Sequence, residues 1–317
     1  MKIGIVEPQG FSKKAKNYLY SIGEVSKFDI SSGDLESFIS NKDILFVRLK
    51  YFYSEQLLRH AKNLKYICSP TTGLNHIDLE YTKNCDIQVI SLHGETAFLN
   101  QITATSEHTF GLVISLLRYY KRVFTEKNLT NFNRDLFKGY EINSSKIGII
   151  GLGRIGSHLV NYFNTFGANV NYFDIDDTKE HPVAKKCSSI KSLIELSDII
   201  ILSVSYTSKN KNMIGRELID MMKEKYFINT SRGEMVDEDY LLDCIGKRFF
   251  SGVAIDVYNN EQGLTNNVEK IMSLATSDLN FICTPHMGGA TVTSMKKTED
   301  FIVRKLKSNI NQIQVSL

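Results

Sequence analysis

Three glycines in one short turn carry the strongest chemical signal of the sequence. Gly151, Gly153 and Gly156 form a GxGxxG pattern that follows an apolar segment and opens a helical one. Gly151 permits a tight turn, Gly153 lets the backbone approach a pyrophosphate, and Gly156 lets the helix pack closely on the strand. Unpaired N–H groups at a helix start bind phosphate. The turn therefore predicts a dinucleotide site.

An acid at the end of the next apolar segment completes the pattern. Asp174 follows Gly153 at about the 20-residue interval expected for a carboxylate that binds a ribose. It would accept hydrogen bonds from both ribose hydroxyls and would repel a 2′-phosphate, so NAD is favoured over NADP. We also assign Arg154 and Ile155 of the turn to the cofactor. The Arg154 side chain would either touch the pyrophosphate or face solvent.

Polar side chains also follow three later apolar segments. Arg232 lies in the segment Asn-Thr-Ser-Arg-Gly, Asp256 and Glu261 lie in and just beyond Ala-Ile-Asp-Val-Tyr, and His286 lies in Thr-Pro-His-Met-Gly-Gly-Ala-Thr. Ligands of open α/β sheets bind beyond the carboxyl ends of the strands. We therefore expect these three loops to share one crevice with the glycine turn.

Short apolar segments alternate with longer amphipathic ones, which predicts an α/β fold with parallel sheets and helices on both faces. In the first part of the chain we expect strands at 3–6, 44–47, 64–68 and 88–90, and helices at 11–22, 35–40, 54–61 and 79–84. One long helix at 103–124 follows. Strands are then expected at 146–150, 170–173, 199–204, 226–229, 253–257 and 281–283, before a last helix at 294–309.

The 317 residues suggest about two domains. We expect one domain from 1–97 with 286–317, and an inserted domain from 98–285. The formal net charge of +3 gives no strong attraction to nucleic acid, and no apolar segment is long enough to cross a membrane. Five cysteines without a CxxC pair predict buried thiols in a reducing compartment, and no signal peptide is apparent, so we expect a cytoplasmic protein. No residues have convincing metal-ligand spacing.

The glycine turn with Asp174 and the three later segments resemble, in this order, the D-isomer-specific 2-hydroxyacid dehydrogenase family. The resemblance covers nearly the whole chain. It implies two Rossmann-like domains: a flavodoxin-like substrate domain, formed by the N-terminal part and the last helix, and an inserted NAD-binding domain. It also implies a homodimer built around the long helix. His108, at the start of that helix, is expected to be a packing or dimer contact.

The resemblance also implies roles in hydride transfer between a 2-keto acid and a D-2-hydroxy acid. Arg232 would bind the substrate carboxylate and polarise the keto oxygen, as its planar fork suits. His286 would be the general acid and base, and Glu261 would orient it. Asp256 would lie beside the nicotinamide. The remaining residues assigned to the cofactor are Thr207, Thr230 and Ser231.

On the substrate side, the resemblance assigns carboxylate binding to the backbone N–H groups of Thr72, Gly73 and Leu74. Arg48 and Lys50 would either reach a phosphate of the substrate or be solvated charges. A phosphorylated or sugar-derived acid, such as 3-phosphoglycerate, is thus one candidate substrate. The regulatory domain of longer phosphoglycerate dehydrogenases is not expected.

Two other functions fit parts of the pattern. An NAD(H)-sensing binding protein similar to some corepressors could keep the same fold and site residues. A formate dehydrogenase is disfavoured, because that relative carries Gln where Glu261 stands.

Overall fold

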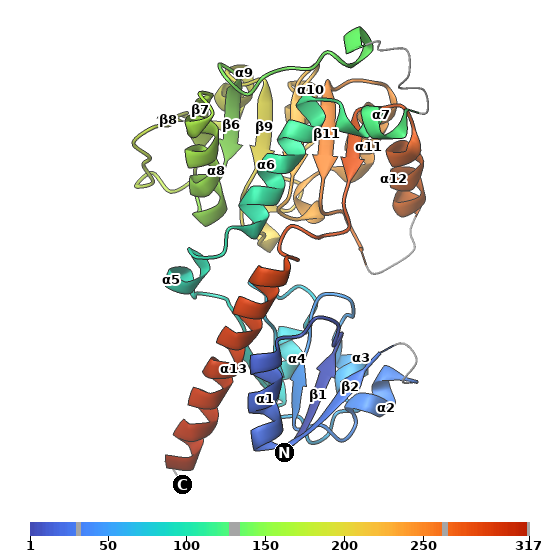
Figure 1. Ribbon diagram of the computed structural model, residues 1–317, viewed down its shortest axis with the longest axis vertical. Helices are drawn as coiled ribbons and strands as arrows, with labels where there is room; N and C mark the ends of the chain where they lie inside the picture. Colours follow the sequence, from blue (N-terminus) through green and yellow to red (C-terminus); the bar gives the residue numbers. More distant parts are fainter. Residues whose placement is uncertain (30–32, 127–133, 262–265, 316–317) are drawn as a thin grey trace. The chain divides into compact units, whose positions relative to one another are not determined.

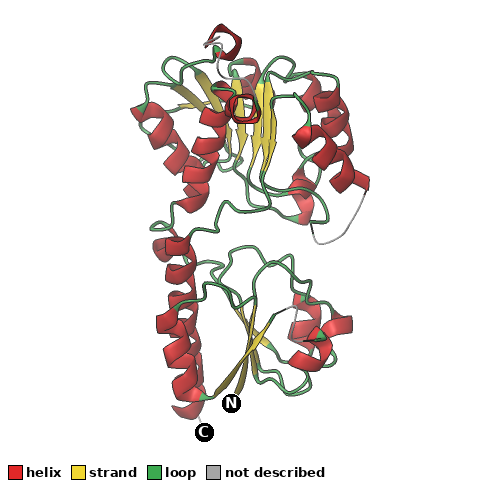
Figure 2. Cartoon of the chain, turned by 45° about the vertical axis from the view of Figure 1, so that its right-hand side comes forward, coloured by secondary structure: helices red, strands yellow, loops and turns green. Residues whose placement is uncertain are grey.

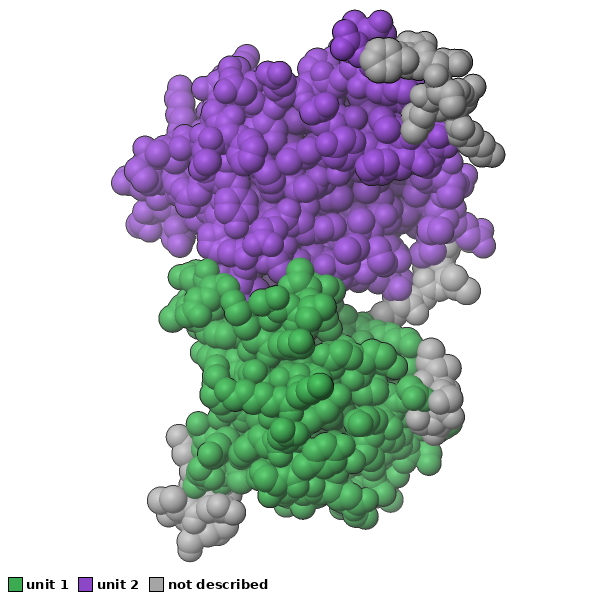
Figure 3. All heavy atoms as spheres, in the orientation of Figure 1, with its two compact units in different colours: residues 1–101, 290–317 green, residues 102–289 purple. Residues whose placement is uncertain are grey.

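A computed structural model describes residues 1–29, 33–126, 134–261 and 266–315 of the chain. Its contacts divide the chain into two units, Met1–Gln101 with Ala290–Leu317 (unit 1) and Ile102–Gly289 (unit 2), shown in different colours in Figure 3. The domain boundaries expected from the sequence, after residues 97 and 285, each lie before the boundaries in the structure, after Gln101 and Gly289. As a consequence His286 belongs to unit 2. Both units are α/β folds built on parallel sheets, which confirms the predicted fold class.

Unit 1 contains a five-stranded parallel sheet in the order β2-β1-β3-β4-β5, the flavodoxin-like order (Figure 1). Its strands are β1 (Lys2–Val6), β2 (Glu24–Phe28), β3 (Ile44–Phe46), β4 (Tyr66–Cys68) and β5 (Gln88–Ile90). The sequence analysis missed β2. This strand lies at the sheet edge and reads Glu-Val-Ser-Lys-Phe with only Phe28 buried, so it lacks the apolar pattern of a central strand.

Helices cover both faces of this sheet. On one face, α1 (Lys13–Ile22), α5 (Thr96–Leu99) and α13 (Val292–Val315) pack against the strands, and α1 and α13 lie side by side. On the other face lie α2 (Leu35–Ile39), α3 (Glu55–Leu58) and α4 (Leu79–Asn84). The Asp78 carboxylate caps α4 by accepting the N–H of Tyr81 at 2.9 Å. The return of α13 to unit 1 was predicted from the sequence.

Unit 2 contains a seven-stranded parallel sheet in the order β12-β11-β10-β9-β6-β7-β8. Figure 2 shows its strands in yellow, with helices beside them. The strands are β6 (Lys146–Ile150), β7 (Asn169–Phe173), β8 (Lys185–Lys186), β9 (Ile199–Leu202), β10 (Tyr226–Asn229), β11 (Gly252–Ile255) and β12 (Phe281–Cys283). One face packs against α6 (Ala104–Leu117) and α8 (Arg154–Thr165). The other packs against α9 (Ile190–Glu195), α10 (Arg216–Asp220), α11 (Glu238–Gly246) and α12 (Asn266–Thr276). Strand β8 was not predicted, since two lysines carry no apolar pattern.

The long helix expected at 103–124 is wrong as a single element. It divides into α6 and α7 (Tyr120–Thr125), because Tyr119 adopts a left-handed backbone with φ of +52°. A later segment closes the end of α6, where the N–H of Tyr140 donates to the Leu117 carbonyl at 2.9 Å. Gly139 fits there because a Cβ atom would lie 2.1 Å from that same oxygen. The helix pattern continues in the sequence, but this contact ends the helix.

The expectation of five buried thiols is wrong in part. Cys68, Cys187 and Cys244 are buried, Cys283 is half-buried and Cys85 is exposed, and all five are free. No helix among the described residues is long and apolar enough to span a membrane. No cluster of three His, Cys, Asp or Glu side chains with the geometry of a metal site occurs in the described part of the chain.

Candidate active site

The carboxyl ends of the parallel strands of unit 2 bring most of the predicted site residues to one edge of the sheet. The glycine turn follows β6, Asp174 follows β7, and Arg232 follows β10. Asp256 follows β11 and His286 follows β12. Strand order reverses beside β6, between its neighbours β7 and β9, and such a switch point is where open α/β sheets bind ligands.

The glycine turn leaves open space at one position only. A Cβ atom at Gly151, whose φ is +98°, would lie 2.5 Å from the Ser203 carbonyl oxygen, and one at Gly156 would lie 2.1 Å from the Gly151 carbonyl oxygen. A Cβ atom at Gly153 would meet nothing within 4 Å. Gly153 is also the N-cap residue of α8. The open position therefore lies at a helix start, where N–H groups attract a phosphate, and it fits the pyrophosphate of a dinucleotide.

Asp174 is held in place by two backbone groups. Its Oδ2 atom accepts the N–H of Leu152 at 2.7 Å, and Oδ1 accepts the N–H of Asp176 at 2.9 Å. Each carboxylate oxygen keeps a further lone pair for a ribose hydroxyl. The neighbouring Ile175 is 92% exposed, which gives an apolar surface that an adenine ring could cover. The sequence analysis did not single out Ile175, although an isoleucine among aspartates in a loop was a visible signal.

Two residues assigned to the cofactor form hydrogen bonds with protein groups. Nη1 of Arg154 donates to the Ile102 carbonyl at 2.6 Å, which is neither of the two placements expected from the sequence. Burial lowers the pKa of this guanidinium. The N–H of Thr207 donates to Oδ1 of Asn210 at 2.8 Å and begins the short helix η3 (Ser208–Asn210), while the Thr207 side chain is exposed. Ile155 is half-buried and packs on the core of unit 2.

The loop that carries Arg232 is tied together by Asn229. Oδ1 of Asn229 accepts the N–H of Ser231 at 2.9 Å, and its Nδ2 donates to the Arg232 carbonyl at 3.0 Å. Nη1 of Arg232 donates to the Ser231 carbonyl at 2.7 Å. The loop also lies against the one that carries Glu261, because a Cβ atom at Gly233 would be 2.3 Å from the carbonyl carbon of Tyr258. Arg232 and Glu261 thus come from adjoining loops.

His286 and Glu261 form a direct pair. Nδ1 of His286 lies 2.7 Å from Oε2 of Glu261, and both side chains are about one-quarter exposed, at 23% and 27%. Nε2 of His286 has no hydrogen-bond partner within the described part of the chain. A carboxylate on Nδ1 fixes that nitrogen as a donor and leaves Nε2 for proton exchange. This arrangement suits a general acid or base.

The backbone at His286 is left-handed, with φ of +49°. Its N–H donates to the Asp256 carbonyl at 2.8 Å and to the Thr284 carbonyl at 3.0 Å. A non-glycine residue in this conformation persists only where its surroundings enforce it, and such residues cluster at functional sites.

Asp256 is the buried centre of these surroundings, with 1% of its surface exposed. Oδ1 accepts the Thr284 hydroxyl at 2.5 Å and the Met287 N–H at 2.9 Å, and Oδ2 accepts the Gly288 N–H at 2.8 Å. Nε2 of His108 lies 3.3 Å from Oδ1. Burial alone would raise the pKa of Asp256, but the hydrogen bonds from His108, Thr284 and the two N–H groups hold it below its usual value. His108, expected to be a packing or dimer contact, contacts this network within its own unit.

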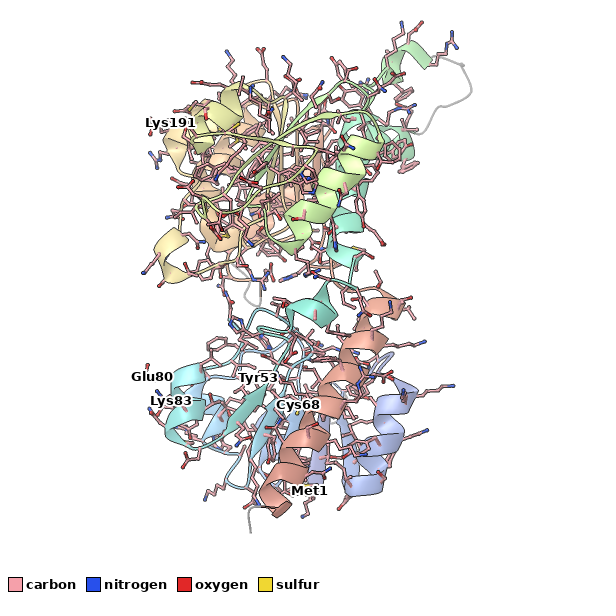
Figure 4. The ribbon with its side chains drawn as sticks, turned by 90° about the vertical axis from the view of Figure 1, so that its left-hand side faces the viewer. Met1, Tyr53, Cys68, Glu80, Lys83 and Lys191 are labelled. Atoms are coloured by element: carbon pink, nitrogen blue, oxygen red, sulfur yellow. The ribbon has the colours of Figure 1, made fainter. Side chains whose placement is uncertain are left out.

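In unit 1, the loop expected to bind substrate is held by side-chain and backbone bonds. Thr71 Oγ1 donates to the Gly73 carbonyl at 2.9 Å and lies 2.7 Å from Ser69 Oγ, which is 3.2 Å from Nε2 of the buried His76. The buried Tyr53, labelled in Figure 4, forms a parallel bridge with Ile77. Thr72 is exposed at the tip, while Gly73 and Leu74 are half-buried.

Arg48 is engaged by protein acceptors of unit 1. Its Nη1 donates to the Gln9 carbonyl at 3.0 Å, and its Nη2 forms an ion pair with Oε1 of Glu299 on α13. The two side chains are 14% and 1% exposed. This arrangement differs from both sequence-based alternatives, a phosphate ligand and a solvated charge. Lys50 has an exposed side chain whose Nζ lies 5.4 Å from the centre of the Tyr51 ring.

Known proteins are similar to this chain in sequence and in fold. The sequence model of the D-isomer specific 2-hydroxyacid dehydrogenase, NAD binding domain, matches residues 110–288. D-3-phosphoglycerate dehydrogenase 2 of Saccharomyces cerevisiae is 29% identical over 296 residues, which cover 91% of this chain and 62% of the relative. D-3-phosphoglycerate dehydrogenase of Methanocaldococcus jannaschii is 28% identical, over 97% of this chain and 57% of the relative. The chain thus spans less than two thirds of the length of these relatives.

A solved structure is similar over nearly the whole chain. The D-lactate dehydrogenase of Aquifex aeolicus, crystallised with NAD and lactic acid, is 28% identical with a TM-score of 0.84. The similarity covers 98% of this chain and 96% of that one.

Proposed function

Since the chain belongs to the D-isomer-specific 2-hydroxyacid dehydrogenases and unit 2 is the NAD-binding domain of that family, we propose that it interconverts a 2-keto acid and a D-2-hydroxy acid with NAD. The observation that supports this most strongly is the His286–Glu261 pair, at 2.7 Å, at the sheet edge that also holds the glycine turn and Arg232. A proton-transfer group beside an NAD site is what keto-acid reduction requires.

Each site residue then has a chemical task. The bound cofactor supplies the hydride that reaches C2 of the keto acid, and removes it in the reverse direction. His286 gives the proton from Nε2 to the keto oxygen, so that the alcohol forms without a free alkoxide. Glu261 stabilises the imidazolium that holds this proton before the transfer and that forms again in the reverse direction. Arg232 binds the substrate carboxylate with its planar fork.

For the cofactor, the open position at Gly153 would receive the pyrophosphate and Asp174 would bind the ribose. We assign Gly151, Gly156 and Ile155 to the frame of this site. The exposed Thr207 would meet the cofactor directly, whereas Thr230 and Ser231 would shape its nicotinamide end from the β10 loop. Arg154, bonded to Ile102, would act by fixing the start of α6.

For the substrate, the loop of Thr72, Gly73 and Leu74 would present backbone N–H groups to the carboxylate. The solved relative holds lactic acid and the yeast relative is named for 3-phosphoglycerate, so both an unphosphorylated and a phosphorylated acid are candidate classes. The Arg48 side chain is already bonded to the Gln9 carbonyl and to Glu299, which favours an unphosphorylated acid. If Lys50→Ala raised the KM for 3-phosphohydroxypyruvate but not the KM for the other keto acids, the phosphorylated class would be supported.

The test is NADH oxidation with hydroxypyruvate, glyoxylate, pyruvate, 3-phosphohydroxypyruvate and bulky keto acids. We expect turnover with at least one acid and a loss of about 10²-fold or more in His286→Ala. If no acid is reduced faster by the wild-type protein than by His286→Ala, the proposed activity is wrong.

We also propose a cytoplasmic homodimer. Phe124, Leu136 and Tyr140 are 78%, 52% and 61% exposed in the region after α6, and such apolar side chains suit a contact with a second copy. Sedimentation equilibrium should give twice the 36.0 kDa chain mass, and Phe124→Glu should shift it toward the monomer. A monomeric wild-type protein at micromolar concentration would contradict the dimer. Cell fractionation tests the compartment.

A further inference from the structure

Two consecutive residues of α6 reach three loops of the site. His108 contacts the loops after β11 and β12, through Asp256 and Thr284. Thr109 Oγ1 lies 2.8 Å from Thr230 Oγ1, in the loop after β10 that carries Arg232. One turn of one helix therefore supports the loops that carry both Arg232 and His286.

The hydrogen bonds of the Thr284 hydroxyl show which ring nitrogen of His108 carries a hydrogen. The Thr284 hydroxyl is 2.5 Å from Oδ1 of Asp256 and donates its only hydrogen there, since an ionised carboxylate only accepts. Its oxygen must then accept from Nε2 of His108, 3.1 Å away. Nε2 of His108 therefore carries a hydrogen, and this N–H faces the Thr284 hydroxyl and the Asp256 carboxylate together.

This N–H completes a closed set of donors around Asp256. The other donors are the hydroxyl of Thr284, which precedes the left-handed residue His286, and the N–H groups of Met287 and Gly288, which follow it. His108 also packs on the turn directly, because a Cβ atom at Gly288 would lie 3.6 Å from its Cδ2 and 3.0 Å from Oδ2 of Asp256. With 17% of its side chain exposed, His108 is mostly covered within unit 2.

We propose that His108 is a positioning residue for the reaction, which acts through Asp256 and Thr284 to hold the 284–288 turn and so aim the His286 imidazole. The proposal rests on the proposed function. Without the Nε2–H group of His108, the Thr284 oxygen and the buried Asp256 carboxylate each lose a hydrogen-bond donor. The left-handed backbone at His286 then loses some of the contacts that hold it in place. A displacement of about 1 Å at a reacting group can cost about 10²-fold in rate.

The experiment compares two substitutions at the same position. His108→Phe keeps a ring and removes the donor, whereas His108→Gln places an amide N–H₂ near the former Nε2 atom. We expect kcat to fall about 10- to 100-fold in His108→Phe, with KM for NADH nearly unchanged, and to recover to within about fivefold of wild type in His108→Gln. Ser106→Ala is the control, because Ser106 is buried on the same helix and lies 3.4 Å from His158.

A second measurement does not depend on turnover. Hydrogen–deuterium exchange of peptides that cover 281–291 should be faster in His108→Phe than in wild type, Ser106→Ala and His108→Gln, while α8 peptides exchange as before. If wild-type protein reduces no keto acid, the proposed function fails, and the exchange rates alone still decide whether His108 holds the turn.

The proposal is overturned if His108→Phe keeps kcat within about twofold of wild type with unchanged exchange at 281–291, or if His108→Gln is no better than His108→Phe. Should His108→Phe not fold, Thr284→Val removes the hydrogen bond between His108 and Thr284 from the other side, together with the one from Thr284 to Asp256. The same loss of kcat and the same faster exchange are then expected, and unchanged values would overturn the proposal equally.

Discussion

The carboxylate of Glu261 lies 2.7 Å from Nδ1 of His286, although the two residues come from the loops of different strands, β11 and β12. Oε1 of the same carboxylate lies 3.3 Å from the N–H of Tyr258, so the carboxylate is aimed from its own loop as well. Nδ1 of His286 thus orients the imidazole ring through Glu261, and Nε2 is left for proton transfer. Its function can be tested by changes that keep the shape of each side chain.

Replacing Glu261 by Gln should lower kcat by about 10²-fold or more, because an amide cannot stabilise an imidazolium and can support the wrong tautomer. KM for NADH should change little, since Glu261 has no assigned cofactor contact. Steady-state kinetics with the best keto acid measure both constants. The exposed Glu269→Gln on α12 is the matched control. A Glu261→Gln enzyme with wild-type kcat would remove Glu261 from the mechanism.

Arg232→Lys keeps the positive charge but loses the planar fork. We expect kcat/KM for the keto acid to fall about 10²-fold, by the loss of charge-assisted bidentate hydrogen bonds, while the affinity for NADH is retained. NADH binding can be followed by calorimetry or by the fluorescence of the bound nicotinamide. Arg216→Lys, at an exposed pair with Asp237, is the control. Equal losses of NADH and keto-acid affinity would assign Arg232 to the cofactor instead.

Asp174→Ala should change the choice of cofactor. The substitution removes the acceptor for the ribose hydroxyls and the charge that repels a 2′-phosphate, so the ratio of kcat/KM for NADPH to that for NADH should rise by about tenfold or more. The control is Asp278→Asn, whose carboxylate forms a surface pair with Arg248. A ratio that stays at the wild-type value would show that other residues select the cofactor.

Arg48→Met should destabilise unit 1 by roughly 3–5 kcal/mol at neutral pH, because it leaves the Glu299 carboxylate buried without its partner. Urea unfolding measures this free energy. Lys191→Met, at the exposed pair with Glu217, should cost no more than about 1 kcal/mol. A loss in Arg48→Met as small as that of the control would show that the ion pair contributes little.

The loss of stability in Arg48→Met should also depend on pH in a defined direction. Burial raises the pKa of Glu299 above its ordinary value of 4.5, and the hydrogen bonds from Arg48 and Ser12 lower it only in part. The folded state therefore takes up a proton at higher pH than the unfolded state. Without Arg48 this pKa rises further, so the stability deficit should be largest at neutral pH and should shrink as protonation of Glu299 removes the buried charge. A deficit that grows on acidification would contradict this assignment.

Local sequence was enough to predict much of the fold. The strand β6, the glycine turn and α8 are consecutive in the chain, and buried parallel strands such as β9 read as apolar runs, so their pattern shows directly. Elements without such a pattern were missed or misjudged. Edge strand β2 is largely polar, and the break between α6 and α7 depends on a contact from Tyr140.

The sequence by itself determined the family, the α/β class, the NAD turn and which residues could do the chemistry, because motifs and periodicity are local properties. Tertiary structure decided what those residues touch. Glu299 holds Arg48 from 251 positions along the chain, and His108 meets Thr284 across 176. These contacts depend on how helices pack against the sheets, and no spacing between residues encodes that packing in a form that can be read along the chain.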